Sequence, residues 1–265
     1  MRMRRLSLAP VATLLGAALA HGCTATPLDA IGLVPEAAAP DAATTTPDLV
    51  AHWSFDEGSG TIAHDDSGNR YHGHLVGGKW VADGRFGGAV RLDLGNYIAV
   101  NGFQDATLGW TISAWVRLTG ADLAGLWGSI LSTEIMSVGG WQLYVDPSDS
   151  SFHSDYVATS GAGGVDTFAC CAPVGPDRWY HLTVVVAGDA RTMTFYEGTQ
   201  LQVTSAMLAT ILPGDPTLYM GTWNASAGQP PGQLAGTIDD VSIWARALGP
   251  DEIVRLDESA VASAP

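Results

Sequence analysis

The chain has 265 residues, and its 27 acidic residues outnumber its 12 basic ones, which gives a formal net charge of −15. A surface that binds nucleic acid needs clustered lysines and arginines, and here Lys79 and a few scattered arginines follow the first five residues, so nucleic acid is not expected as a partner. The hydrophobic content of 46% allows a sizeable core, and a low charged fraction with 32 glycines and nine tryptophans is typical of an all-β protein with many turns.

Residues 1–22 have the pattern of a signal peptide. A basic start is followed by an apolar stretch from Leu6 to Ala20, which Pro10 interrupts and which is too short to span a bilayer as a helix. Two cleavage sites are consistent with this pattern. An Ala-x-Ala site at 18–20 predicts a freely secreted protein, whereas AHGC at 20–23 resembles a bacterial lipobox, in which Cys23 is lipidated and starts the mature chain.

Residues 23–48 are rich in Ala, Thr, Pro and Asp and have little to bury, which predicts a flexible, disordered tether. Such a tether is expected where the N-terminal end of the mature chain is anchored to a membrane. We therefore expect an exported protein of the cell envelope, in the outer membrane or periplasm, that reaches the membrane only through a lipid on Cys23. Secretion is the alternative.

From residue 49 onward, short β-rich runs alternate with turns. Within the run 141–145 the side chains of Trp141, Leu143 and Val145 share one face, as a strand requires. Residues 250–256 predict a helix, because Pro stands near the first turn and acids follow it. Without βαβ spacing, the pattern predicts an all-β fold at 49–257: a two-sheet antiparallel β-sandwich with one short C-terminal helix, then a frayed tail at 258–265. Strands are predicted at 49–56, 73–77, 79–82, 89–93, 96–100, 110–118, 127–133, 140–146, 155–159, 179–187, 191–197, 200–205, 216–221 and 234–245.

Several motifs occur in an order that a known family shares. They read AHWSFDEGSGTIAHDDSGNRYHGHL (51–75), GRFGGAVRLD (84–93), TISAWVR (111–117), WYHLTVV (179–185) and LAGTIDDVSIWARALGPDEI (234–253). This series resembles the laminin-G-like jellyroll domains of the concanavalin A-like lectin/glucanase superfamily, over 49–257. The resemblance implies a curved two-sheet sandwich, commonly with a structural calcium. Many such domains are carbohydrate-binding or adhesive modules, and some relatives are glycoside hydrolases.

The carboxylates do not form the pattern that glycoside hydrolysis requires, which is a pair flanking the scissile bond. In the glucanases that these domains resemble, the pair comes from a Glu-x-Asp-x-x-Glu run, and none of the glutamates here has such partners. No serine-hydrolase elbow, zinc helix or phosphate loop is present in the sequence. We therefore predict a non-catalytic, lectin-like module. A protein-interaction or structural module is the alternative, and a hydrolase with an unrecognised carboxylate pair is a third interpretation.

The run 237–244 raises the question of calcium. A period of two places Asp239 with Val241 and Ile243 toward the core edge, and a buried carboxylate needs partners. The family resemblance places the turn 65–69 nearby, and its oxygens suit a hard cation. One hypothesis is therefore a structural Ca²⁺ held by Asp66, Asn69 and Asp239. In the other, Asp239 accepts hydrogen bonds from the glycine-rich turn without metal, and Asp66 and Asn69 only form their turn.

If Cys23 is lipidated, the adjacent Cys170 and Cys171 remain. An exported domain can keep disulfides, so a vicinal disulfide between them is expected. Neighbouring Cα atoms, ~3.8 Å apart, lie closer than in most disulfides. Two free buried thiols are the alternative.

Candidate glycan contacts lie where aromatic residues occur in polar or flexible segments. The run 148–156 (SDSSFHSDY) is predicted as such a loop, and Trp127 and Trp223 stand near turns. An exposed ring stacks on the apolar face of a sugar, while Asp and Asn bind hydroxyls. We predict a monomeric module whose ligand is a polysaccharide or glycoprotein, neutral or cationic rather than sulfated; the alternative is that these loops bind nothing. The predicted contacts are Asp155, Tyr156, Trp223 and Asn224.

Overall fold

The computed structural model describes residues 48–104, 109–119, 127–135, 138–157, 165–170, 174–207, 210–223 and 232–261, with the backbone alone at 165–170. The predicted signal peptide, the tether with Cys23 up to residue 47, and the residues Cys171 and Asn224 lie outside these ranges. The described residues belong to one compact unit.

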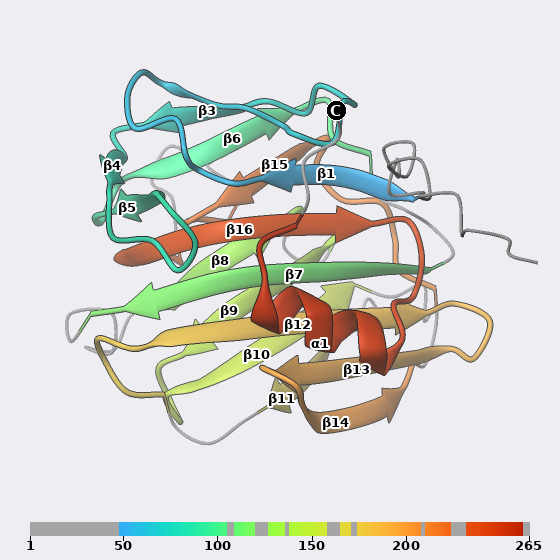
Figure 1. The fold of residues 1–265 in the computed structure, drawn as a ribbon. Helices are drawn as coiled ribbons and strands as arrows, with labels where there is room; N and C mark the ends of the chain where they lie inside the picture. The colour runs from blue at the N-terminus through green and yellow to red at the C-terminus, as the bar shows by residue number, and fades with distance from the viewer. Residues whose placement is uncertain are drawn as a thin grey trace, which may run out of the picture. The chain divides into compact units, whose positions relative to one another are not determined.

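The first sheet has eight antiparallel strands and is built around β16 (Figure 1). One edge of β16 pairs with β7, and its other edge pairs first with β5 and then with β1. The first and the last strand of the domain are therefore neighbours. In order the strands are β14 (Gln200–Ala206), β13 (Thr192–Glu197), β12 (Trp179–Ala187), β7 (Gly109–Leu118), β16 (Gly236–Trp244), β5 (Ala89–Leu92) and β4 (Lys79–Val81), with β1 (Leu49–Trp53) beside β16.

The second sheet also has eight antiparallel strands and lies behind the first in Figure 1. Its strands β9 and β10 pair in a continuous register, whereas the register of β8 with β9 shifts between Ser129 and Leu131. In order the strands are β11 (Val165–Cys170), β10 (Ser151–Val157), β9 (Trp141–Asp146), β8 (Gly128–Ser132), β15 (Thr217–Met220), β6 (Tyr97–Asn101), β3 (Gly73–Val76) and β2 (Ile62–Ala63). The predicted two-sheet antiparallel sandwich is confirmed.

The core lies between the two sheets and follows the alternation of the sequence. Trp141, Leu143 and Val145 of β9 point into it, as predicted. Leu182 and Val184 of β12 point into it from the other sheet. Fully burying side chains of this size contributes roughly 1.5–3 kcal/mol each, so the period-two pattern holds the two layers together.

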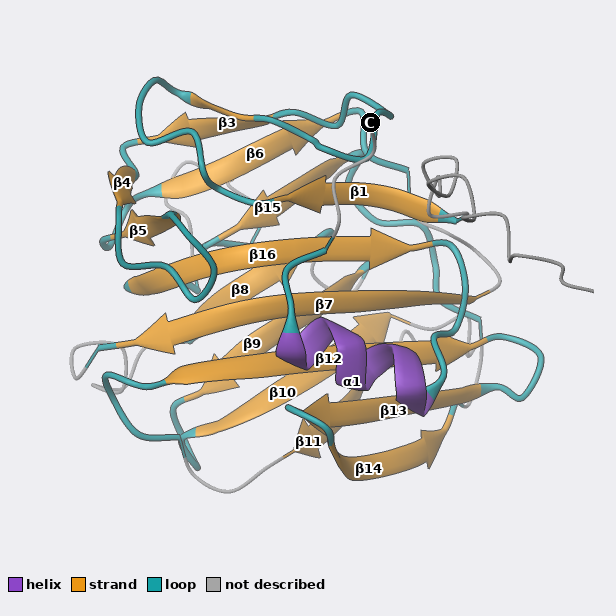
Figure 2. Ribbon diagram, in the orientation of Figure 1, coloured by secondary structure: helices purple, strands orange, loops and turns teal. Residues whose placement is uncertain are grey.

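The helix α1 (Pro250–Glu258) lies across the outer face of the first sheet (Figure 2). It begins as predicted, with Pro250 in its first turn and Glu252 accepting a hydrogen bond from the Gly249 backbone N–H at 2.9 Å. Ile253 and Leu256 pack in a second apolar cluster with Trp244. No helix in the described part of the chain is long and apolar enough to cross a bilayer.

Three local predictions are wrong. The run 148–156 is not a loop, because β10 begins at Ser151. The strands β2 and β11 had no strong sequence signal and were not predicted. The tail does not fray at once, since Val261 is 9% exposed, packs beside α1 and points its backbone N–H at the Asp240 carboxylate.

A bulge in β16 reverses the expected orientation of Asp239. The register with β7 shifts between Asp239 and Ser242, and Asp240 has a positive φ of 43°. A bulge adds one residue, so the alternation of faces changes phase there. Asp239 consequently lies opposite Trp115 on the outer face of the sheet, and the prediction that it points toward the core edge is wrong.

Candidate functional site

The two outer faces of the sandwich are covered differently. On the first sheet, α1 and the end of the chain lie over the outer face (Figure 1). Among the described residues, no helix or strand lies over the outer face of the second sheet. We therefore examine the second face first as a place for a ligand.

A row of three rings runs across β8, β9 and β10 on this face; we call it the aromatic row. Tyr144 and His153 are directly opposite each other in the β9–β10 pair, with ring centroids 5.4 Å apart. The Trp127 ring lies 5.3 Å from Tyr144, just before β8 begins. Tyr144 is 2% and His153 6% exposed, whereas Trp127 is 50% exposed. Trp127 is thus the most exposed ring of the row.

The imidazole of His153 is held from its other side. Its Nε2 lies 3.0 Å from an oxygen of Asp149 and 3.1 Å from the Ser151 hydroxyl. These contacts fix the ring against Tyr144, and Tyr144 in turn supports Trp127. The row is therefore a supported platform rather than a lone surface ring.

A second row, one step along the same strands, carries oxygen atoms. Asp155 lies opposite Gln142, and Gln142 lies opposite Ser132. The side chain of Glu134 hydrogen-bonds with Asp155, as does that of Tyr144. Burial, and then the charge of Glu134, raises the pKa of Asp155 to about 8, and burial raises the pKa of Glu134.

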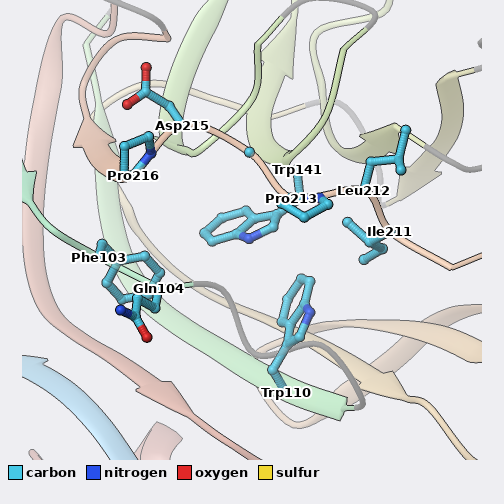
Figure 3. Close-up of a pocket in the computed structure, with 10 residues that line it drawn as sticks. Phe103, Gln104, Trp110, Trp141, Ile211, Leu212, Pro213, Asp215 and Pro216 are labelled. Atoms are coloured by element: carbon cyan, nitrogen blue, oxygen red, sulfur yellow. The ribbon is translucent and has the colours of Figure 1, made fainter.

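A cavity of about 320 Å³ opens at one end of the sandwich, a size found for small-molecule sites (Figure 3). Phe103, Trp110 and Trp141 line it together with residues 211–216, and the two indole centroids are 5.2 Å apart. In Figure 3 the Asp215 carboxylate points away from these rings. The wall is therefore mainly apolar and suits an apolar group better than a set of hydroxyls.

The structure separates the predicted glycan contacts. Asp155 is in the second row of the open face, 8% exposed. Tyr156, its neighbour on the strand, is fully buried in the core, so its prediction as a surface contact is wrong. Trp223 follows β15, and its indole nitrogen is buried without a hydrogen-bond partner. Asn224 lies outside the described residues.

The predicted calcium ligands each have other contacts. Asp66 accepts a hydrogen bond from the Ser54 hydroxyl at 2.8 Å, and Asn69 donates its amide to the backbone carbonyls of Leu49 and Val50. Asp239 accepts hydrogen bonds from the backbone N–H groups of the 84–88 turn. None of these contacts joins the turn 65–69 to Asp239, and a calcium ion shared by the three residues stays a prediction.

A serine, a histidine and an aspartate meet beneath α1. The Ser113 hydroxyl lies 2.7 Å from Nε2 of His181, and Nδ1 of His181 lies 3.1 Å from Asp257 of the helix. This is the order of contacts in a hydrolase triad. Ser113 is 2% exposed and His181 also 2%, however, and Trp115 stacks on the imidazole at 4.8 Å. The arrangement docks the helix on the sheet rather than presenting a nucleophile to a substrate.

The cysteine predictions fall largely outside the described residues. Cys170 ends β11, with its backbone alone described. A bond from Cys170 to Cys171, like lipidation of Cys23, stays a prediction.

Comparison with known families agrees with this architecture. Residues 92–254, more than half of the chain, match a family model of the concanavalin A-like lectin/glucanases superfamily. The chain belongs to this superfamily. Among curated proteins, none matches the sequence.

Solved structures with the same fold include toxin binding domains. The binding domain of Paraclostridial Mosquitocidal Protein 1 is 18% identical, with a TM-score of 0.63, and the match covers 80% of this chain and 52% of that one. The binding domain of botulinum neurotoxin DC, in complex with rat synaptotagmin II, is 15% identical with a TM-score of 0.63 (81% and 52% covered). The ligand-binding domain of botulinum neurotoxin serotype D, in complex with N-acetylneuraminic acid, is 14% identical with a TM-score of 0.61 (80% and 50%).

These likenesses concern the fold. The chain spans about half the length of each of those domains. Their ligands therefore do not locate a binding site on this chain.

Proposed function

We propose that this protein is a non-catalytic glycan-binding module, exported and displayed at the cell envelope through a lipid on Cys23. The observation that carries the proposal is the half-exposed indole of Trp127, which Tyr144 and His153 support on the outer face of the second sheet. A large exposed ring on a rigid platform suits stacking against the apolar face of a sugar. The ligand is a polysaccharide or a glycoprotein.

The carboxyls of the open face support binding rather than hydrolysis. Glu134 and Asp155 are hydrogen-bonded to each other. Retaining glycosidases hold their two carboxyl groups about 5–5.5 Å apart, and inverting ones hold them farther apart still, with the scissile bond between them. Two carboxyls in direct contact leave no room for that bond.

The test uses Trp127→Ala in the full chain against a panel of neutral, amino and sialylated glycans. Losing a stacking ring of this kind weakens binding by roughly 10-fold, which corresponds to about 1.4 kcal/mol. The matched control is Leu201→Ala, which removes another exposed apolar side chain, 56% exposed, on the first sheet. Unchanged affinity in the Trp127 variant, or silence of the intact protein on the whole panel, would contradict the proposal.

A second candidate function, protein interaction, has one observation in its favour. β14 is the edge strand of the first sheet, and most of its side chains are at least partly exposed, with Leu201 the largest apolar one. An exposed edge can pair with a strand of another chain. Silence on glycans, together with capture of an envelope protein that Leu201→Lys abolishes, would favour this function.

A further inference from the structure

Three oxygen-bearing side chains converge on the outer face of β8, β9 and β10. Asp155 and Gln142 are directly opposite each other in the antiparallel β9–β10 pair. Cβ atoms in such a position are about 4.5–5.5 Å apart, within reach of one another's side-chain oxygens. Glu134, two residues beyond β8, contacts the Asp155 carboxyl. Glu134 is 4%, Gln142 3% and Asp155 8% exposed.

Two oxygens in this cluster have no hydrogen-bond partner. They are Oδ1 of Asp155 and Oε1 of Gln142. Buried polar atoms almost always have a partner, and an exception needs an explanation such as an ion or a water. The amide oxygen of Gln142 is independent of the acid pair, and its register position aims it at the same place.

The acid pair of the cluster also lacks a basic side chain as a partner. Two carboxylates in contact oppose each other's ionisation, and an amide oxygen adds a third negative end. Among the described residues, no lysine, arginine or histidine forms a salt bridge with Glu134 or Asp155. A cation between the three side chains would neutralise the acids and use the unpartnered oxygens as ligands.

We infer that Glu134, Asp155 and Gln142 hold a calcium ion on the outer face of the second sheet. The donors are all oxygens, which Ca²⁺ prefers, whereas zinc and copper favour nitrogen and sulfur. No group of three His, Cys, Asp or Glu side chains suited to a metal occurs among the described residues, and the proposed site uses the Gln142 amide as its third protein ligand. Backbone carbonyls and waters complete the six to eight ligands, a number typical of Ca²⁺.

This site is distinct from the one that the sequence predicts at Asp66, Asn69 and Asp239. Its ligands come from β9, β10 and the end of β8, so the ion would join three neighbouring strands directly beside the aromatic row. It does not depend on glycan binding, because its effect is on the stability of the sheet.

The experiment measures the melting temperature of the full chain, first stripped with chelator and then titrated with CaCl₂. At a calcium concentration about 100-fold above the Kd, we expect a rise of roughly 5–10 °C. Asp155→Asn and Glu134→Gln each abolish most of this rise. Asp93→Asn, which neutralises an acid that is 46% exposed on the first sheet, keeps it. Isothermal titration with CaCl₂ gives one site in the wild type and none in Glu134→Gln, which tests the site even where Asp155→Asn does not fold.

Three results would overturn the inference. The first is a wild-type protein whose melting temperature does not respond to calcium. The second is an equal response in the wild type and in Glu134→Gln. The third is a response that Asp239→Asn abolishes and Glu134→Gln keeps, which would assign the ion to the site that the sequence predicts.

Discussion

The two outer faces of the sandwich both bury acids, but the acids have opposite kinds of partner. On the first sheet, Asp239 accepts two backbone N–H groups, Asp240 lies 2.7 Å from Nε2 of His52, and Asp257 contacts His181. On the second sheet, the side chains of Asp155 and Glu134 hydrogen-bond to each other. Acids of the first kind attach segments of the chain to the sheet, whereas Asp155 and Glu134 form the acid pair to which we assign a calcium ion.

The aromatic residues differ between the faces in the same way. Trp115 on the first sheet is covered by the Arg85 guanidinium at 4.4 Å and stacks on His181. Trp127 beside the second sheet is half exposed. The outer face of the first sheet is thus covered by the chain's own loop and helix. The outer face of the second sheet carries the aromatic row instead. The comparison yields four predictions, from the largest effect to the smallest.

The sharpest test compares one histidine from each face. His181→Ala should lower the free energy of unfolding by about 3 kcal/mol, because it leaves Ser113 and Asp257 unpaired beneath the helix. His153→Ala should cost only about 1 kcal/mol, since its partner Asp149 is 48% exposed and regains water. Urea unfolding at pH 8 measures both. An equal loss of unfolding free energy in the two variants would contradict the proposed difference between the two outer faces.

A smaller effect concerns Asp239 and the turn that it holds. Asp239→Ala should cost about 2 kcal/mol, because the N–H groups of Arg85 and Phe86 lose their acceptor. Asp239→Asn keeps an acceptor and should be nearly neutral. Melting temperatures of both variants at pH 7 are the measurement, and an asparagine variant as unstable as the alanine variant would contradict it.

The same carboxyl gives a pH dependence. Burial raises the pKa of Asp239 from the ordinary value of 3.8 to about 7. The folded state therefore binds more protons than the unfolded state between about pH 4 and pH 7, so this group makes stability fall as the pH rises through that window. Asp239→Asn should flatten the pH profile of the melting temperature there. An unchanged slope would mean that Asp239 is ionised in the fold.

The smallest effect is at the edge of α1. Two nitrogens of the Arg246 guanidinium donate to the Glu252 carboxylate, at 2.6 and 2.8 Å, and this pairing lowers the pKa of Glu252 to about 2. Both side chains are about one-third exposed, so Glu252→Gln should cost only about 1 kcal/mol at pH 7.

Because the folded pKa of Glu252 is depressed, the stabilisation is complete above about pH 4.5 and is lost as the pH falls toward 2. Urea unfolding at pH 7 and pH 2.5 measures the change. Asp251→Asn, in the same turn but exposed, is the control. A cost for Glu252→Gln that stays constant with pH would contradict the assignment.

The sequence predicts the sandwich well because its central strands alternate strictly. Trp141, Leu143 and Val145 face the core as the period of two requires. The pattern fails at Asp239, where a bulge changes the phase of β16 without any glycine or proline to mark it. It also fails at β10, where the polar composition of 148–156 resembles a loop because alternate residues face the outside of the sheet.

The sequence predicts only some of the residues of the candidate site. Trp127 was visible as an aromatic residue near a turn, and Asp155 as a polar residue near an aromatic one. Their neighbours Tyr144, His153 and Gln142 become neighbours only through the register of β9 and β10. The short turn between β9 and β10 sets this register, and the start of β10 lies inside a segment that the sequence predicts as a loop.

The first strand also has a mechanical consequence. β1 is the point at which the preceding segment joins the domain, and β16 holds one of its edges. Its other edge is secured by the turn 65–69, where Asn69 and Ser67 bond the carbonyls of Leu49 and Val50, and the Asp66 N–H bonds the carbonyl of His52. A force applied to the segment before β1 must therefore break both rows of bonds before the strand leaves the sheet. If that segment is the tether that the sequence predicts, the domain is held firmly at its point of attachment.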